Sequence, residues 1–367
     1  MKVLFACGGS GGHITPALAM AQILSRSDAS FTAAMVGNEN GMERRRAAEE
    51  GLRFYPLAIE GLHRSVTLRN LRTLFLAAKA PHAAKKILKD FVPDLVIGTG
   101  GYVSYPVIPA AHTLGIPTLL YEPNAIPGLA VRMTEKHADA VLLQFDACAA
   151  HLRYREKARV IGAPLRTDFE SRTRSEARAK LRLPQSAFVV LCFGGSLGAE
   201  RISSAVSEVY ARAERLGILL IHACGERLFS SLKVKHPREA ESGLLLPYIS
   251  DMGTYMAAAS VVVCRAGAMT LAELSGIGRA AILIPSPYVA ENHQEKNARL
   301  YEGRGASLVI AEQALTGDAL AERLLFLKGN PSLLRQMEKN AAALSSRHTE
   351  DSLLAAVREV MQKRILP

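Results

Sequence analysis

A glycine-rich loop that ends in a histidine is the first stretch of the chain that could do chemistry. Gly8–Gly12 reads Gly-Gly-Ser-Gly-Gly, follows the apolar run Lys2–Ala6 and precedes His13. Glycines allow backbone N–H groups to approach an anion, and a helix beyond the loop adds its positive dipole end. The third glycine of a dinucleotide fingerprint would fall on Ile14, and no Gly-Lys dipeptide of a Walker loop occurs. The sequence therefore predicts a ligand-binding loop of another kind.

His13 allows two interpretations. A neutral imidazole beside a helix N-terminus resists protonation, so it could act as a general base near neutral pH. A histidine that only caps or packs the turn explains the local sequence equally well. The neighbouring residues leave both interpretations open.

A strand, a tight turn and a helix follow one another over residues 261–274. Val261–Cys264 is apolar and β-branched, as in a buried strand, and Arg265–Ala268 is a turn of small residues. A helix is predicted from Met269 to the glycines at positions 276 and 278. The N–H groups at the start of such a helix attract phosphate.

Glu273 would lie one turn inside this helix, on the same face as Met269 and Thr270. A carboxylate at that place would repel phosphate but could bind a vicinal diol such as a ribose. We interpret the stretch as a nucleotide diphosphate site. An ordinary strand–helix unit with a solvated Glu273 is the simpler explanation of this stretch when it is considered alone.

Two further loops follow predicted strands. Gly100–Ser104 repeats the pattern of a glycine loop before a helix, and Tyr121–Gly128 ends a strand with two prolines and a glycine. Ligands bind at such strand ends in open α/β sheets. Asn124 could bind a sugar hydroxyl or cap the next helix, and Gln294 could reach a sugar or be solvated at a helix start.

The sequence predicts no metal site and no cofactor. It contains no Asp-x-Asp and no His, Cys or carboxylate spacing typical of metal ligands. A phosphate leaving group would then be neutralised by helix ends and arginines. The five cysteines form no CxxC pair, which indicates buried thiols of a reduced, cytosolic protein. No apolar run approaches the roughly 20 residues that a bilayer span needs.

The elements that position these residues alternate between strands and helices. A length of 367 residues predicts two domains. Alternation predicts parallel sheets with helices on both faces. The strands predicted first are Lys2–Ala6, Phe31–Val36, Arg53–Ala58, Leu95–Gly98, Thr118–Tyr121, Ala140–Leu143 and Arg159–Ile161. The second series is Phe188–Phe193, Ile218–Ala223, Leu244–Leu246, Val261–Cys264, Ala281–Ile284 and Ser307–Ile310.

Both series begin with a strand that runs into a glycine loop, so we expect two similar doubly wound α/β domains. The expected domains are residues 1–162 and 163–343, with Gly162–Arg166 as the linker between them. A last helix within residues 344–367 is expected to pack back on the first domain. A helix near Thr15 and Pro16 is expected to open directly after the first loop, because proline favours the first position of a helix.

The charge balance favours anionic partners. Lys and Arg outnumber Asp and Glu by 45 to 34, a net charge of +11. Aromatic residues make up only 6% of the chain, and no basic stretch rich in rings resembles a reader of single-stranded nucleic acid. We therefore expect nucleotides, phosphates or an anionic membrane rather than nucleic acid.

The segment Gly61–Lys89 contains seven Lys or Arg residues and no acid. Apolar residues recur in it at helical spacing. They are Leu68, Leu71, Leu74, Phe75 and Ala78. A basic amphipathic helix of this kind suits the surface of an anionic membrane. The alternative is an ordinary helix whose apolar side belongs to the core.

Taken together, these motifs resemble the bacterial lipid-linked N-acetylglucosaminyltransferases of peptidoglycan synthesis. The resemblance runs from Lys2 to the final helix, and it depends on the order of seven motifs. They are GGSGGH (8–13), GGYVS (100–104), EPNAIPG (122–128), GAPLR (162–166), GGSLGA (194–199), CRAGAMTLAE (264–273) and HQEKNA (293–298). The resemblance implies a glycosyltransferase-B fold, in which two Rossmann-like domains face each other across a cleft.

The resemblance also implies roles for individual residues. His13 is the candidate base, and Gln294 would bind the hydroxyls of the transferred sugar. The other positions that match substrate-binding residues of the family are Ser10, Gly11, Gly12, Asn124, Arg166, Ser196, Ile249, Ala268, Met269, Thr270, Leu271, Ala272 and Glu273. Asn124 and Arg166 match donor contacts, and Ser196 matches a diphosphate contact. Ile249 would meet the uracil through its backbone, and Glu273 would bind the ribose.

The implied reaction is a metal-independent, inverting transfer of N-acetylglucosamine from UDP-N-acetylglucosamine to the muramyl 4-hydroxyl of a lipid-linked acceptor. The protein would then lie on the cytoplasmic face of the cell membrane. Two alternatives are an epimerase that acts on UDP-N-acetylglucosamine and a non-catalytic protein that binds nucleotide sugars. The basic, leucine-bearing segment Gly61–Lys89 argues against the epimerase, which needs no lipid surface. The non-catalytic alternative, which includes a membrane scaffold, predicts UDP binding without turnover on any lipid acceptor.

Overall fold

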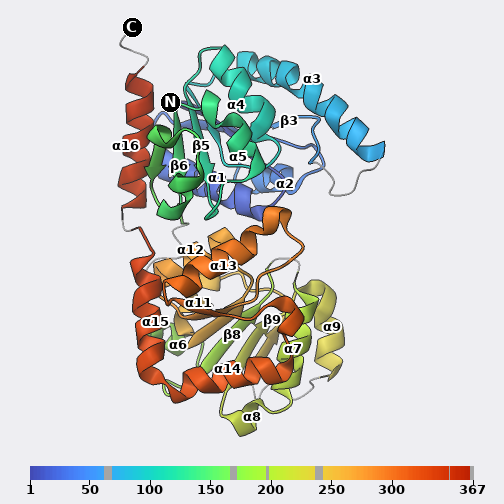
Figure 1. Cartoon of the computed structure of the whole chain (residues 1–367), viewed down its shortest axis with the longest axis vertical. Coiled ribbons are helices and arrows are strands. Elements are labelled where there is room, and N and C mark those ends of the chain that lie inside the picture. Colours follow the sequence, from blue (N-terminus) through green and yellow to red (C-terminus); the bar gives the residue numbers. More distant parts are fainter. Residues whose placement is uncertain (62–67, 166–171, 196–197, 236–242, 347, 364–367) are drawn as a thin grey trace. The chain divides into compact units, whose positions relative to one another are not determined.

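The computed structural model describes residues 1–61, 68–165, 172–195, 198–235, 243–346 and 348–363. The chain forms two compact units, which Figure 1 shows in sequence colours. Unit 1 comprises Met1–Arg166 together with Ser346–Pro367, and unit 2 comprises Thr167–Ser345. Each unit has its own parallel sheet.

Unit 1 contains a seven-stranded sheet in the order β3-β2-β1-β4-β5-β6-β7, in which every pair is parallel. Its strands are β1 (Lys2–Ala6), β2 (Thr32–Gly37), β3 (Arg53–Pro56), β4 (Leu95–Gly98), β5 (Thr118–Glu122), β6 (Ala140–Leu143) and β7 (Ala158–Val160). The helices are α1 (Gly11–Ser27), α2 (Met42–Glu49), α3 (Leu68–Phe91), α4 (Ser104–Thr113), α5 (Leu129–Thr134) and α16 (Thr349–Gln362). Short 3₁₀ turns are η1 (Glu135–His137), η2 (Asp146–His151) and η3 (Arg155–Lys157).

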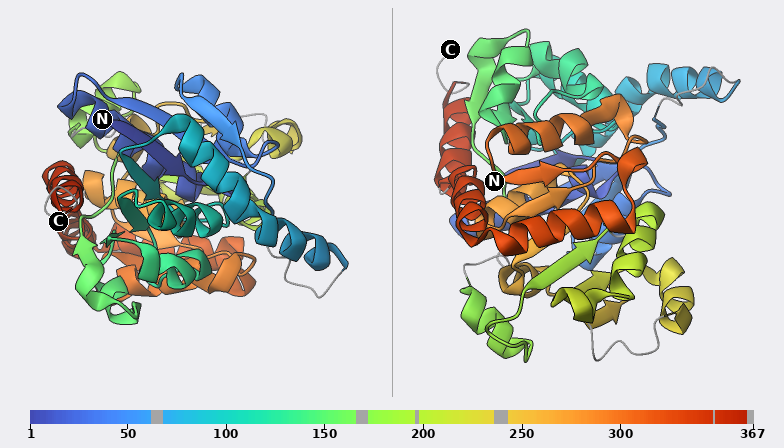
Figure 2. Two further views of the ribbon diagram at one scale, coloured as in Figure 1. Left: turned by 90° about the horizontal axis from the view of Figure 1, so that it is seen from above. Right: turned by 60° about the horizontal axis from the view of Figure 1, so that its bottom comes forward.

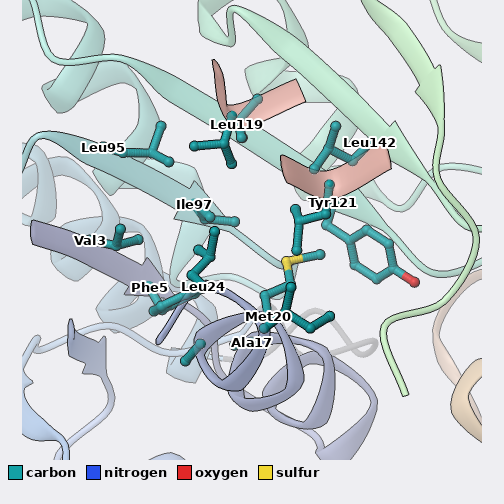
Figure 3. Close-up of a cluster of buried hydrophobic side chains, with 14 of the residues drawn as sticks. Val3, Phe5, Ala17, Met20, Leu24, Leu95, Ile97, Leu119, Tyr121 and Leu142 are labelled. Atoms are coloured by element: carbon teal, nitrogen blue, oxygen red, sulfur yellow. The ribbon is translucent and has the colours of Figure 1, made fainter. Parts of the chain in front are cut away.

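Alternate residues of the central strands serve the two faces of this sheet, as the strand period of two requires. Val3 and Phe5 of β1 belong to a cluster with α1 and α16, which Figure 3 shows around Met20 and Leu24. The intervening residues Leu4 and Ala6 join a second cluster with α3 and α4. Because both faces are covered, the strands are apolar throughout, which made them visible in the sequence.

Unit 2 repeats this plan with a six-stranded parallel sheet in the order β10-β9-β8-β11-β12-β13. Its strands are β8 (Val189–Phe193), β9 (Leu219–Ala223), β10 (Gly243–Leu246), β11 (Val261–Cys264), β12 (Ala281–Leu283) and β13 (Ser307–Val309). The helices are α6 (Arg174–Lys180), α7 (Glu200–Tyr210), α8 (Ala213–Leu216), α9 (Glu226–Lys235), α11 (Met252–Ala258), α12 (Ala268–Ile277), α13 (His293–Gly303), α14 (Gly317–Gly329) and α15 (Pro331–Ala343). The 3₁₀ turns are η5 (Ala290–Asn292) and η6 (Glu312–Ala314). The prediction of two doubly wound parallel-sheet α/β folds is confirmed.

The helix α16 returns to unit 1 after the chain has built unit 2, as Figures 1 and 2 show in red. It contributes Leu353, Ala356, Val357 and Val360 to the cluster that contains α1. Arg159 of β7 donates to both carboxylate oxygens of Glu359, at 2.8 and 3.2 Å. A second ion pair, from Arg26 to Glu350, spans 3.0 Å.

The start of α1 differs from the prediction. The helix begins at Gly11 rather than near Thr15, so Pro16 lies inside it. Ser10 is the N-cap residue in an extended conformation, and its carbonyl accepts the N–H groups of His13 and Ile14. The last glycines of the loop and His13 therefore form the first turn of the helix itself. Among the helices described, none combines the length and the apolar character needed to cross a membrane.

Leu353→Ala should destabilise the protein by about 2–5 kcal/mol, because it removes a fully buried side chain from the contact between α16 and unit 1. The free energy of unfolding in urea measures this cost. Arg358→Ala, at an exposed position of the same helix, is the matched control and should change it by less than about 0.5 kcal/mol. Equal stability of the two variants would show that α16 contributes little to the core.

Candidate active site

The predicted loops leave both sheets where the strand order reverses. In unit 1 the order reverses between β1 and β4, and in unit 2 between β8 and β11. Ligands of open α/β sheets bind at the carboxyl ends of the strands at such a switch point. The loop Gly8–Gly12 follows β1, Gly100–Ser104 follows β4, and the turn Arg265–Gly267 follows β11. Two motifs of unit 1 and one of unit 2 are thus placed at the ligand-binding edge of their sheets.

Ser10, Gly11 and Gly12 lie at the N-terminus of α1, and Ser10 is exposed. Gly9 has φ +90, a left-handed conformation that favours glycine. The side chain of Ser10 caps no N–H group of the helix, and no acid occupies its first turn. This helix end therefore offers N–H groups and the positive end of the dipole to a ligand.

Thr99 determines how the ring of His13 is held. His13 Nδ1 lies 3.0 Å from the carbonyl oxygen of Thr99, and Thr99 Oγ1 donates to the carbonyl of His13 at 2.6 Å. A carbonyl only accepts, so Nδ1 carries the proton and Nε2 carries the lone pair in the neutral ring. The interpretation of His13 as a base requires this tautomer. Thr99 was not predicted, although it directly precedes the second glycine loop.

The two glycine loops of unit 1 pack against each other too closely for side chains. A Cβ on Gly100, which has φ +98, would lie 2.6 Å from His13 Nδ1. A Cβ on Gly101, which has φ +74, would collide with the carbonyl oxygen of Gly8. Ser104 Oγ donates to the carbonyl of Ala6 at 3.0 Å and so joins α4 to the end of β1. The GGYVS motif therefore positions the first loop.

Asn124 lies in the loop after β5 and does not cap the next helix. The N-cap residue of α5 is Gly128, so the capping interpretation is wrong. The backbone N–H and the side-chain amide of Asn124 both donate to Oε1 of Glu122, each at 2.9 Å. The N–H of Gly128 donates to Oε2 of Glu122 at 2.8 Å. Glu122 was missed as a site residue, although an acid directly at the end of a buried strand was a visible signal.

The helix α12 begins at Ala268, one residue earlier than predicted, and ends at Ile277, with Gly278 as a C-cap in the left-handed conformation. Six of its residues were predicted to bind a ligand, and they fall into two groups. Ala268, Leu271 and Ala272 are buried, so only their backbone atoms could face a ligand. Met269, Thr270 and Glu273 are partly exposed and share the accessible face of the helix. No acid occupies the first turn of α12, which leaves the positive dipole end available for phosphate.

Two side chains brace the turn before α12. Arg265 forms an ion pair with the buried Glu312 and donates to the carbonyl of Ile284 at 3.1 Å. Asn297 of α13 is fully buried and donates to the carbonyl of Ala266 at 3.3 Å. Arg265 and Asn297 lie within two of the sequence motifs, but the sequence alone indicates no role for either. Their partners come from distant parts of the chain, so no local pattern marked them.

Gln294 and Ile249 follow two other strands of unit 2. Gln294 lies in the first turn of α13, and its Oε1 accepts the N–H of Ser286 at 2.8 Å. This bond directs the amino branch of the Gln294 amide away from Ser286. Ile249 follows β10, and its side chain is buried, so a ligand could meet only its backbone.

Arg166 and Ser196 lie outside the described residues. Within the described part of the chain, no three His, Cys, Asp or Glu side chains gather closely enough to hold a metal ion. All five cysteines are buried and unbridged, as predicted.

The helix α3 exposes the apolar residues that the sequence placed on one face. Leu71, Leu74 and Phe75 are 64%, 57% and 58% exposed, and Lys79 Nζ lies 4.0 Å above the ring of Phe75. The core-facing residues of α3 are Ala80, Ala84, Leu88 and Phe91. Of the predicted apolar residues, Leu71, Leu74, Phe75 and Ala78 are exposed and therefore do not belong to the core. Arg64 and the side chains of Leu68, Arg69 and Arg72 lie outside the described residues.

The chain matches both domains of one enzyme family. Residues 3–143 match the glycosyltransferase family 28 N-terminal domain, and residues 189–353 match the C-terminal domain of the same family. The two matches span the strands of both sheets except β7, and they include both switch points.

Whole relatives agree with these domain matches. A UDP-N-acetylglucosamine–N-acetylmuramyl-(pentapeptide) pyrophosphoryl-undecaprenol N-acetylglucosamine transferase from Acetivibrio thermocellus is 38% identical, over 99% of both chains. The enzyme of that name from Exiguobacterium is 38% identical over 99% of this chain and 100% of its own.

Among solved structures, Acinetobacter baumannii MurG has a TM-score of 0.78 and 26% identity, over 97% of this chain and 99% of its own. A UDP-GlcNAc 2-epimerase from Neisseria meningitidis has a TM-score of 0.65 over 99% and 100%, but its 13% identity shows a shared fold alone. The identity to the transferases extends over nearly the whole chain and includes both domains of family 28. This chain therefore belongs to the family of UDP-N-acetylglucosamine–N-acetylmuramyl-(pentapeptide) pyrophosphoryl-undecaprenol N-acetylglucosamine transferases.

Proposed function

We propose that this protein transfers N-acetylglucosamine from UDP-N-acetylglucosamine to the 4-hydroxyl of undecaprenyl-diphospho-N-acetylmuramoyl-pentapeptide in peptidoglycan synthesis. The observation that carries the proposal is 38% identity, over nearly the whole length, to enzymes with this activity in their names. The placement of the motifs at the switch point of each sheet supports it. A transfer assay with the purified lipid acceptor and UDP-N-acetylglucosamine tests it directly.

Unit 2 would hold the donor. The N-terminus of α12 suits the diphosphate, because the positive end of the helix dipole attracts phosphate and no acid lies in its first turn. Glu273, on the accessible face one turn further, suits the two ribose hydroxyls as an acceptor. Gln294 would donate its side-chain N–H to a hydroxyl of the sugar, since its Oε1 already accepts Ser286. Ile249 would meet the uracil through its backbone, and Ser196 and Arg166 would contact the diphosphate and the donor.

Unit 1 would supply the base and face the acceptor. Nε2 of His13 would take the proton of the muramyl 4-hydroxyl as that oxygen attacks the anomeric carbon in line. The bond from the anomeric carbon to the diphosphate oxygen breaks, its electron pair leaves with UDP, and the configuration inverts. The carbonyl of Thr99, hydrogen-bonded to Nδ1, stabilises the imidazolium that forms. Ser10, Gly11 and Gly12 would contact substrate at the end of α1 beside this base.

The helix α3 would contact the cytoplasmic face of an anionic membrane, where the lipid acceptor resides. Its exposed Leu71, Leu74 and Phe75 could enter the interface, and Lys79 and Lys86 would lie near anionic head groups. Each cation near such a surface contributes roughly 1 kcal/mol. Unlike a spanning helix, this attachment would be peripheral and sensitive to salt.

Glu273→Ala should weaken binding of UDP-N-acetylglucosamine roughly ten- to a hundredfold, because hydrogen bonds to a charged group contribute about 1.5–3 kcal/mol. Isothermal titration calorimetry with the full-length protein measures the dissociation constant. Glu322→Ala removes an exposed carboxylate of α14 and should leave it unchanged. A Glu273 variant that binds as tightly as the native protein would exclude the ribose contact.

His13→Ala should lower kcat by about 10²–10⁴, the usual contribution of a general base, without changing donor affinity. Single-turnover transfer to the lipid acceptor separates the chemical step from binding. His151→Ala, which removes an exposed histidine of the same unit, is the control. Normal turnover of the His13 variant would remove it as the base.

Phe75→Glu should reduce sedimentation with anionic vesicles at least tenfold and leave the thermal midpoint unchanged, because the side chain is already exposed. Leu325→Glu places the same charge on an exposed apolar position of α14 and should not affect sedimentation. Binding of the native protein should fall with added salt and be weaker on neutral vesicles. Equal binding to neutral and anionic vesicles would contradict the electrostatic contribution.

A further inference from the structure

The loop after β5 is organised around one buried carboxylate. Glu122 is 2% exposed and accepts three N–H groups. Its Oε1 receives the backbone and the side-chain amide of Asn124, both at 2.9 Å, and its Oε2 receives the N–H of Gly128 at 2.8 Å. A single side chain thus closes the loop and also holds the amide of Asn124.

This arrangement allows only one orientation of the Asn124 amide. The atom that faces Glu122 must be a donor, because both oxygens of Glu122 act as acceptors. A flipped amide would place Oδ1 against Oε1 and leave two acceptors facing each other at a buried position. The Nδ2 branch therefore faces Glu122, and the Oδ1 branch is directed away from it.

Asn124 is also the accessible residue of this segment. Across residues 121–125, all of which the structure describes, its side chain alone is partly exposed. The adjacent helix takes its N-cap from Gly128, so helix capping does not require Asn124. A partly exposed amide, held by a buried carboxylate at the carboxyl edge of a parallel sheet, is well placed to bind a ligand.

We propose that Glu122 is a positioning residue that sets the polarity of Asn124, so that Asn124 Oδ1 accepts a hydrogen bond from a hydroxyl of the transferred sugar. This inference rests on the proposed function, because it takes the ligand of the loop to be the donor sugar. Gln294 of unit 2 provides the contrast. Its Oε1 is held by the N–H of Ser286 at 2.8 Å, so it offers the donor branch of its amide. One amide accepts and the other donates, and each polarity is set within its own unit.

The test replaces single hydroxyls of the sugar. The full-length protein is assayed with UDP-N-acetylglucosamine and with its 3-, 4- and 6-deoxyfluoro analogues, because fluorine cannot donate a hydrogen bond. At one position, kcat/KM of the native protein should fall roughly five- to a hundredfold, as expected when a buried acceptor loses its donor. In Asn124→Ala, kcat/KM with that analogue should be less than about twofold below kcat/KM with UDP-N-acetylglucosamine. Gln294→Ala should lower kcat/KM with every donor, and the ratio between this analogue and UDP-N-acetylglucosamine should stay as in the native protein.

Glu122→Ala tests the positioning role. It removes both acceptors, so the Asn124 amide is no longer held in one orientation and the discrimination against the fluoro analogue should shrink as in Asn124→Ala. Combining Glu122→Ala with Asn124→Ala should shrink it no further, because Glu122 acts on the sugar only through Asn124. A merely structural role for Glu122 predicts a lower rate with every donor and an unchanged discrimination. Glu156→Ala, at an exposed carboxylate of the same unit, should behave as the native protein.

The inference is overturned if no fluoro position depends on Asn124, or if folded Glu122→Ala keeps the full discrimination of the native protein. If Glu122→Ala shows no thermal transition, Asn124→Asp decides, because it keeps an oxygen for the sugar but has no side-chain N–H for Glu122. Full discrimination in Asn124→Asp also overturns the inference. Transfer of ordinary N-acetylglucosamine by the native protein supports the proposed function whatever the analogues show. If the native protein transfers none, calorimetric dissociation constants for the same analogues and variants still test the polarity of Asn124.

Discussion

The contact between two glycine loops is the constraint on which the arrangement of unit 1 depends. Gly100 and Gly101 leave room for His13 and for the carbonyl of Gly8, and any Cβ at these two positions would collide with them. The contact joins the ends of β1 and β4 where the strand order reverses. It also brings Thr99 to the ring of His13, so backbone packing determines which ring nitrogen carries the proton. The role proposed for the side chain of His13 therefore depends on the absence of side chains at positions 100 and 101.

Both units prepare a helix end for a ligand, but they support it differently. In unit 1 the N-terminus of α1 is held by backbone contacts among glycines. In unit 2 the turn before α12 is braced by side chains, through the pair of Arg265 with Glu312 and the amide of Asn297. The charge of Arg265 is neutralised by its partner, which leaves backbone N–H groups and the helix dipole as the groups offered to an anion.

The sequence predicted the sheets well because both faces of each strand are buried, which produces apolar runs such as Val261–Cys264 that end at glycines. It also predicted the glycine loops, because the close approach of two backbone segments requires glycine, and runs of glycine are visible in the sequence. The start of α1 was misplaced because Pro16 was read as the first residue of a helix, whereas the glycines before it are themselves helical. Thr99 and Glu312 were missed because their partners His13 and Arg265 lie far away in the sequence. Glu122 was missed although its partners are only two and six residues away.

The order of the chain has a consequence for synthesis on the ribosome. Residues 167–345 separate the two parts of unit 1, so α16 emerges only after unit 2 has left the exit tunnel. Until then, the apolar cluster that α1 forms with the sheet lacks Leu353 and Val357. The nascent unit 1 therefore exposes apolar residues until α16 has been synthesised, a state that chaperones commonly shield. A chain truncated before α16 would leave these apolar residues of unit 1 exposed after its synthesis.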